Sequence, residues 1–140
     1  MSEELITVFE GALDEEGLVH LREDDEQTYR LTFKSEGDRY FVVVYRNDPQ
    51  FAMVGTGWAL AENVDLSDAL ALANVLNARK KFVKVAVWEE QRDVLFTVEL
   101  PMGEGAEIGE TLSRILDALR DCVGEYFAGL RSDYDEPTTE

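Results

Sequence analysis

The sequence predicts an α+β domain in which helices pack on one antiparallel sheet, in the order α-β-β-β-α-β-β-α. Short stretches that are rich in valine, or that alternate apolar and polar residues as strands do, are separated by turn residues. Three longer stretches repeat apolar residues at helical spacing, one near each end of the chain and one between. The chain of 140 residues has the length of a single domain. We expect that domain to span residues 1–131 and a mobile acidic tail to follow at 132–140.

The N-terminal half holds one predicted helix and three predicted strands. Leu5, Phe9 and Leu13 recur at every fourth residue and predict a helix over residues 3–13. Residues 18–24 fit either a short strand or a loop. Strands follow in the alternating "TYRLTFK", the continuously apolar "RYFVVVY" and then "FAMVGTGWAL", with turns at "SEGD" and "RNDPQ" between them.

Two glycines of the third predicted strand, Gly55 and Gly57, share one face of it. A glycine inside a strand marks either a bulge or a place where another element comes close to the backbone. The sequence leaves both interpretations open.

The C-terminal half predicts a helix, a hairpin and a second helix. Asp65 is a suitable N-cap for the helix in "NVDLSDALALANVLNARKK", and Leu72 and Val75 lie off its main apolar stripe. That stripe consists of Leu66, Ala69, Leu70, Ala73 and Leu76. "FVKVAVWEE" and "VLFTVELP" form the hairpin around "QRD". The last helix begins near Glu107, with Cys122 beside its stripe as a small buried residue. This stripe consists of Ile108, Leu112, Ile115, Leu119, Val123, Tyr126 and Leu130.

Charge is the strongest feature of the composition. Thirty acidic residues oppose thirteen basic ones, which gives a formal net charge of −17. Binding of a phosphate backbone requires clustered lysine and arginine, so we expect no direct contact with nucleic acid. The acidic surface keeps the protein soluble, or it also steers a basic protein partner, such as one that itself binds nucleic acid.

The sequence also indicates in which cellular compartment to expect the protein. Its N-terminus is acidic and no run of 18 apolar residues occurs, so we expect neither a signal peptide nor a membrane span. One cysteine allows no internal disulfide, which fits a reducing cytoplasm.

No group of residues predicts catalysis. His20 is the only histidine and is expected in a solvated loop, and Cys122 is expected to be an unreactive core thiol. The acidic stretch "REDDE" lacks the glycine and glutamate of a calcium loop, and "GTGW" does not open a phosphate-binding helix. We therefore expect no enzyme activity, metal or cofactor, and a binding protein is the better hypothesis.

Two features are candidates for contact with a partner. The first is an acidic run that consists of Glu23, Asp24, Asp25 and Glu26. It ends a region in which ten of residues 1–26 are acidic and only Arg22 is basic. The second is the tryptophans Trp58 and Trp88, near the ends of predicted strands. Core packing accounts for both, but tryptophan is also enriched at binding hot spots, so one of them is a candidate to line a partner surface.

The junction "ANVLNARKKFVKVAVWEE" holds three of the four lysines and contains no glycine or proline between the predicted helix and strand. Asn74 and Asn77 share a helix face there and can bond backbone groups of the adjoining strand or loop. Arg79, Lys80 and Lys81 lie in the last turn, where the helix dipole favours cations. This basic cluster has a structural interpretation, as a helix cap that neutralises nearby acids, and an alternative one as a partner contact.

The stretch "LALANVLNARKKFVKVAVWEEQRDVLFTVELPM", followed by a long terminal helix, resembles the YbjN family. The resemblance rests on the Asn74–Asn77 pair, the lysine-rich start of the first hairpin strand, the acidic hairpin turn and the "ELP" that ends the second hairpin strand. The element order is also similar to that of class I type III secretion chaperones. The resemblance implies a bacterial cytoplasmic protein, often dimeric, with regulatory, stress-related or chaperone-like binding of partners, and no catalytic residues or cofactor.

We therefore expect a non-enzymatic protein-binding module, as a homodimer, with an acidic surface for a basic partner. The alternative is a small-ligand sensor with a pocket between the sheet and the helices.

Overall fold

The computed structural model describes residues 2–102 and 108–134, and it confirms the α+β class. Its elements are α1 (Ser2–Glu15), β1 (His20–Asp24), β2 (Thr28–Ser35), β3 (Asp38–Tyr45), β4 (Phe51–Ala59), α2 (Leu66–Arg79), β5 (Lys84–Trp88), β6 (Asp93–Pro101) and α3 (Ile108–Tyr134). The predicted order is reproduced with one addition. The stretch that fitted either a strand or a loop forms β1, so the sheet has six strands and not five.

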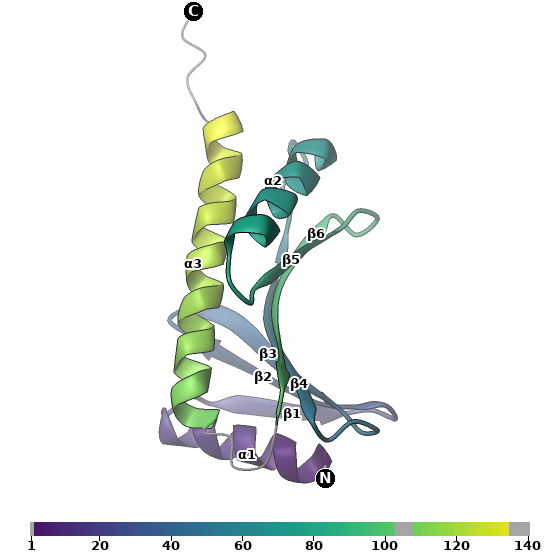
Figure 1. The fold of residues 1–140 in the computed structure, drawn as a ribbon, viewed down its shortest axis with the longest axis vertical. Coiled ribbons are helices and arrows are strands. Elements are labelled where there is room, and N and C mark those ends of the chain that lie inside the picture. The colour runs from purple at the N-terminus through teal and green to yellow at the C-terminus, as the bar shows by residue number, and fades with distance from the viewer. Residues whose placement is uncertain (1, 103–107, 135–140) are drawn as a thin grey trace, which may run out of the picture.

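The six strands form one sheet in the order β1-β2-β3-β4-β6-β5, and every neighbouring pair is antiparallel. The sheet bends strongly along its length (Figure 1). Two residues, Glu36 and Gly37, connect β2 to β3, and both have positive φ, at 51° and 87°. A two-residue hairpin turn of this hand matches the natural twist of the strands, and Gly37 adopts it without steric cost.

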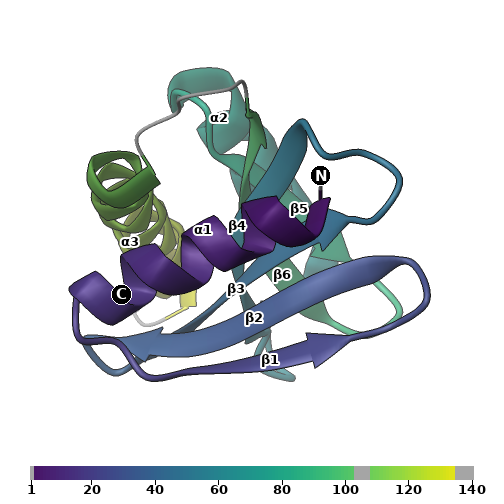
Figure 2. The ribbon, with the colours of Figure 1, turned by 90° about the horizontal axis from the view of Figure 1, so that it is seen from below.

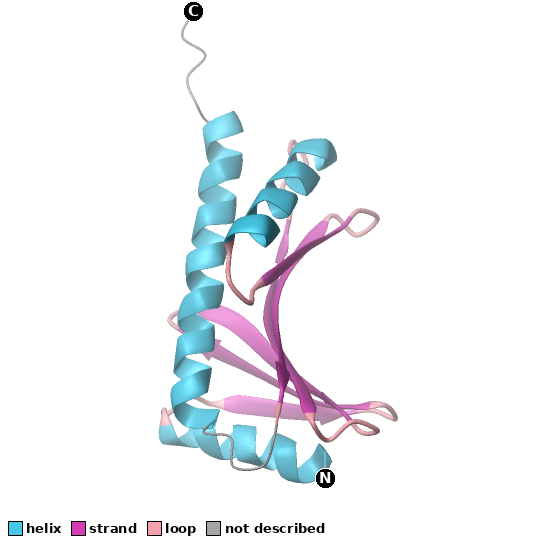
Figure 3. Cartoon of the chain, viewed as in Figure 1, coloured by secondary structure: helices cyan, strands magenta, loops and turns pink. Residues whose placement is uncertain are grey.

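All three helices lie on the same side of the sheet (Figures 1 and 3). Seen from below, α1 crosses over the strands β2 and β3 (Figure 2), and it packs against both of them. The long α3 lies against β6, α1 and α2. Its stripe is buried at Ile108, Leu112, Ile115, Leu119, Tyr126 and Leu130. The core therefore fills the space between one face of the sheet and the three helices.

Two predicted core positions are wrong in detail. Leu70 is 40% exposed, because α2 turns Ala69, Ala73 and Leu76 toward the core instead. In α3, Cys122 is fully buried and Val123 only half-buried, so the buried stripe runs through the cysteine.

Small residues let α2 and α3 come close. A Cβ atom at Gly129 of α3 would lie 2.8 Å from Cδ2 of Leu72 on α2. Leu72, which lies off the main stripe of α2, therefore packs in this contact between the helices. Nearby, the buried Tyr126 hydroxyl donates a 3.0 Å hydrogen bond to the Ala69 carbonyl.

The ends of the helices follow the sequence closely. Asp65 caps α2 by accepting a 2.8 Å hydrogen bond from the Ser67 N–H. The last helix continues to Tyr134, three residues into the predicted tail, and residues 135–140 lie outside the described part of the chain. None of the described helices combines the length and apolarity needed to cross a membrane.

Candidate protein-interaction surfaces

The side chains that the structure describes include no group of three histidines, cysteines or carboxylates placed to hold a metal ion. Cys122 is buried, and this burial raises the pKa of its thiol to about 11. The thiol is therefore protonated and unreactive near neutral pH.

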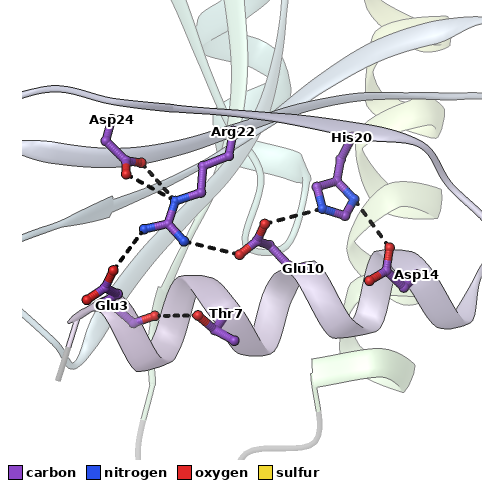
Figure 4. A network of polar contacts seen from close by, with 7 residues as sticks. All are labelled: Glu3, Thr7, Glu10, Asp14, His20, Arg22 and Asp24. Atoms are coloured by element: carbon purple, nitrogen blue, oxygen red, sulfur yellow. Dashed lines mark hydrogen bonds and ion pairs between the residues drawn. The ribbon is translucent and has the colours of Figure 1, made fainter.

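An ion-pair network joins α1 to β1 (Figure 4). At its centre, the Arg22 guanidinium lies within 3.4 Å of the carboxylates of Glu3, Glu10 and Asp24. The hydrogen bond to Asp24 is the main reason that the pKa of Arg22 is raised. His20 lies beside it, with Nε2 3.4 Å from Glu10 and Nδ1 3.7 Å from Asp14.

The expectation that His20 lies in a solvated loop is wrong. Its segment pairs with β2, which turns the imidazole toward α1 and leaves it 13% exposed. Together with Arg22, it ties the N-terminal helix to the edge of the sheet.

The acidic run lies at the end of β1 and in the turn that follows. Asp24 is engaged by Arg22, and the Asp25 carboxylate accepts hydrogen bonds of 2.8 and 2.7 Å from the N–H groups of Gln27 and Thr28. These bonds lower the pKa of Asp25 and hold the turn. Glu23 and Glu26 are exposed, and within the described residues neither carboxylate has a partner. Half of the run is therefore structural, and the other half presents free charge.

The two tryptophans have different environments. Trp58 is half-buried against the core, and its ring lies 5.7 Å from that of Phe127. Trp88 ends the edge strand β5 and is 54% exposed. Of the two, only Trp88 is available to a partner.

The asparagines of the helix–strand junction also differ. The Asn77 amide bonds both backbone groups of Val85: its Nδ2 donates to the carbonyl at 2.9 Å, and its Oδ1 accepts from the N–H at 2.7 Å. Asn77 thus occupies the place that a neighbouring strand would take beside β5, and it blocks the edge there. Asn74 is exposed, and the described residues include no hydrogen-bond partner for it.

The basic cluster of the junction contacts α3. Lys80 Nζ lies 2.5 Å from Oε1 of Glu125, and Arg79 lies 3.9 Å from Oε2 of the same carboxylate. The hydrogen bond from Lys80 is the main cause of a lowered pKa of Glu125. Lys81 is exposed, without an ion pair among the described residues.

Exposed apolar side chains occur on α2, in the turn that follows it and on β5. Leu70 and Val75 lie on opposite flanks of α2, and Trp88 points to the sheet face away from α2, as Lys84 does. We define the α2–β5 surface by Leu70, Val75, Phe82 and Trp88, which are 40%, 43%, 59% and 54% exposed. Phe82 also has a φ of 51°. A bulky residue in the left-handed region is a conformational outlier, and such strain is frequent at functional positions. The sequence signal for this strain is the absence of a glycine between the helix and the strand.

The side of the sheet away from the helices, the open face, has a different composition. Strand alternation places Phe41, Val43, Met53 and Leu95 on it, and none of them belongs to the core under the helices. A Cβ at Gly55 would lie 2.7 Å from the Phe41 ring, and one at Gly57 would lie 3.1 Å from Leu95 Cδ1. The two glycines therefore make room for side chains of neighbouring strands, which decides between the two interpretations of this pair.

A small cavity lies between the end of α1, the β2–β3 turn and the start of α3. Its volume is about 230 Å³, and it is lined by Glu16, Leu18, Ser35, Glu36, Leu112, Ser113, Leu116, Asp117 and Arg120. The Arg120 guanidinium is held at the wall by Glu36 at 2.8 Å and Asp117 at 3.1 Å.

The family described as "YbjN: Putative bacterial sensory transduction regulator" matches residues 6–132. The chain belongs to the YbjN family. A search of the curated proteins gives no match.

Three solved structures are similar to the chain. An uncharacterized protein from Methanothermobacter thermautotrophicus has a TM-score of 0.71 and 13% identity, over 96% of this chain and 99% of that one. YbjN from E. coli, titled a "putative transcription regulator", has a TM-score of 0.61 and 12% identity, over 94% and 93%. A chain of the heterodimeric ExoU-SpcU complex from the type III secretion system of Pseudomonas aeruginosa has a TM-score of 0.45 and 21% identity, over 91% and 98%. At these identities, the first two likenesses show the fold alone.

Proposed function

We propose that this YbjN-family protein is a non-enzymatic protein-binding module with a regulatory, stress-related or chaperone-like role in the bacterial cytoplasm, and that it acts as a homodimer. The α2–β5 surface is the observation that carries this proposal. It presents four large apolar side chains to solvent, and one of them is held in a strained backbone conformation. Large apolar side chains that a protein exposes to solvent are candidates for contact with a partner.

We assign the homodimer to the part of this surface around Phe82 and not to the bare sheet edges. Asn77 blocks part of the β5 edge, and charged side chains of Arg22, Glu23 and Asp24 blunt the β1 edge. The apolar residues of α2 and β5 have no such cover among the described residues. A two-fold arrangement places the same surface of both copies in contact.

The dimer is tested by light scattering at micromolar concentration, where a mass of about twice 15.8 kDa is expected. Phe82→Asn is the sharpest variant, because asparagine tolerates positive φ and lacks the apolar ring. It should weaken the dimer while leaving the melting temperature of the monomer unchanged or higher. Val19→Asn is the matched control, since Val19 is 89% exposed and precedes the opposite edge strand. A wild-type protein that stays monomeric would remove the dimer from the proposal.

The partner is expected to be a basic protein, such as one that itself binds nucleic acid. The support is the net charge of −17 and the free carboxylates of Glu23 and Glu26. Complementary charge mainly accelerates encounter, so association should be fast at low salt and slower as salt is raised.

Affinity capture from cells that express the protein, followed by mass spectrometry and reconstitution with the purified partner, tests this function. Stopped-flow association is then compared for Glu23→Gln with Glu26→Gln and for the matched pair Glu62→Gln with Glu110→Gln, whose side chains are also exposed. The first pair should slow association and the second should not. An identical effect of both pairs would assign the steering to net charge and not to the acidic run.

A small-ligand sensor is the second candidate, supported by the cavity at Arg120. The cavity is smaller than the roughly 300–1,000 Å³ of usual ligand sites, and the Arg120 charge is already satisfied by two carboxylates. A metabolite that copurifies with the protein and raises its melting temperature, with no protein captured, would favour the sensor over the binding module.

A further inference from the structure

We propose that the open face of the sheet binds an extended acidic segment of a partner protein, with carboxylates at Arg30, Lys34 and Arg39 and an apolar side chain against Phe41. This inference rests on the proposed protein-binding function and adds a second contact to it: the acidic segment binds the open face, apart from the basic region of the partner that the acidic run steers. We call the three cations the basic corner.

The basic corner is formed by like charges that the sheet holds together. Lys34 of β2 and Arg39 of β3 are direct cross-strand partners, and both are exposed. Like charges in this position destabilise a sheet. Within the described residues neither side chain has an ion pair, although the chain contains 30 acids. The turn next to them contains Glu36, but its carboxylate is engaged 2.8 Å away by Arg120.

Arg30 connects this charge to the apolar part of the open face. Its guanidinium lies 6.0 Å from the centre of the Phe41 ring, and it is the cross-strand partner of Val43. Lys84 lies on the same face, but it is paired with Glu99 at 2.6 Å. On β1, the acidic Glu23 is the cross-strand partner of Arg30, so the basic corner does not extend onto β1. The cations of the basic corner therefore lie beside the half-buried Phe41, whereas Val43 is only 1% exposed.

An extended protein segment fits this arrangement better than a nucleic acid does. Its side chains alternate, so that carboxylates and apolar groups reach the surface at a regular spacing. Arginine and lysine pair readily with carboxylates, and the partly exposed Phe41 ring offers an apolar contact beside them. A phosphate backbone needs many cations, whereas this corner supplies three on a protein whose net charge is −17.

The test uses a short synthetic peptide in which glutamates alternate with serine and phenylalanine, and a second one with lysine in place of glutamate. Binding is followed by NMR of the methionine methyl groups. Met53 is half-buried on the open face, and Met102 is buried in the core under the helices. The acidic peptide should shift the Met53 signal and leave Met102 unchanged, and the lysine peptide should shift neither.

Charge reversal at the basic corner is the second part of the test. Lys34→Glu with Arg39→Glu should weaken binding of the acidic peptide at least about tenfold, because two charge contacts become repulsive. Arg114→Glu with Arg131→Glu is the matched control, since both arginines are exposed on α3 and the change in net charge is equal. The control should bind as the wild type does. Since all four residues are exposed, the fold should persist, and circular dichroism checks this.

Other outcomes overturn the inference. Binding of the lysine peptide, tighter binding of a single-stranded oligodeoxythymidine, or a Met53 shift that depends only on protein concentration would assign the open face to a basic segment, a nucleic acid or a second copy of the chain. If a captured partner binds the wild type and the Lys34→Glu, Arg39→Glu variant equally well, the protein-binding function stands and the open face is not its site.

Discussion

The side chains on the two faces of the sheet are buried in different ways. On the covered face, Val42, Val54 and Phe96 are fully buried under the helices. On the open face, the described residues cover one another within the sheet: Phe41 lies over Gly55, and Leu95 lies over Gly57. The covered face thus supplies most of the apolar burial that stabilises the fold. The open face and the α2–β5 surface keep apolar and charged groups that the chain does not use internally, and these are the groups that we assign to binding.

The largest expected effect is a difference in the free energy of unfolding between a variant in the core and a variant on the open face. Leu119→Ala should lower the free energy of unfolding by about 2–5 kcal/mol, since Leu119 is fully buried. Leu95→Ala removes the same atoms from a half-buried site on the open face and should cost about 1 kcal/mol. Denaturant melts of both variants measure the difference. Equal losses would mean that the open face is packed as tightly as the core.

A second prediction concerns how the open face covers itself. A Cβ at Gly55 would come within 2.7 Å of the backbone oxygen of Phe96 as well as of the Phe41 ring. Gly55→Ala should therefore destabilise the protein by about 1–3 kcal/mol, because backbone cannot yield as a side chain can. At Gly57 the only close atom is the flexible end of Leu95, so Gly57→Ala should stay within about 0.5 kcal/mol of the wild type. The same melts decide this, and a mild Gly55→Ala variant would contradict the close approach of Phe41.

The edge of β5, where Asn77 bonds the backbone of Val85, gives a third test. Asn77→Ala leaves the N–H and carbonyl of Val85 without their partner and should cost about 1–2 kcal/mol. The control Asn74→Ala changes an exposed amide on the same helix face and should be nearly neutral. Amide hydrogen exchange at Val85 should accelerate in the first variant alone. Unchanged protection there would show that α2 shields the edge without the help of Asn77.

The smallest effect concerns Glu125, whose pKa is lowered mainly by its hydrogen bond from Lys80. A carboxyl with a lowered pKa in the folded state stabilises the fold above its unfolded pKa, and this contribution is lost as pH falls through the folded value. In Lys80→Met, the pKa of Glu125 should rise toward its ordinary value, as an NMR titration of the carboxyl would show. An unchanged pKa of Glu125 would mean that solvent screens the Lys80–Glu125 pair too strongly for Lys80 to lower it.

The sequence predicted the class, the order of eight elements, the Asp65 cap and most of the α3 stripe, because these depend on local periodicity and local hydrogen bonds. It could not decide β1, since the apolar Val19 and Leu21 of "LVHLRED" remain exposed and the strand is fixed by pairing with β2. It also misplaced Leu70, because the rotation of α2 depends on how its alanines fit the core. The left-handed conformation of Phe82 and the identity of Phe41 as the neighbour of Gly55 depend on tertiary packing, which the local sequence does not specify.

The most direct test of protein binding through the uncovered surfaces is titration calorimetry of the captured partner with four forms of the protein. These are the wild type, the Lys34→Glu, Arg39→Glu variant, the Phe82→Asn variant and the Arg114→Glu, Arg131→Glu control. The account predicts a saturable complex for the wild type and the control, and a dissociation constant raised at least about tenfold, or about 1.4 kcal/mol, by a surface variant. Equal binding by all four, or no saturable complex with any partner, would contradict it.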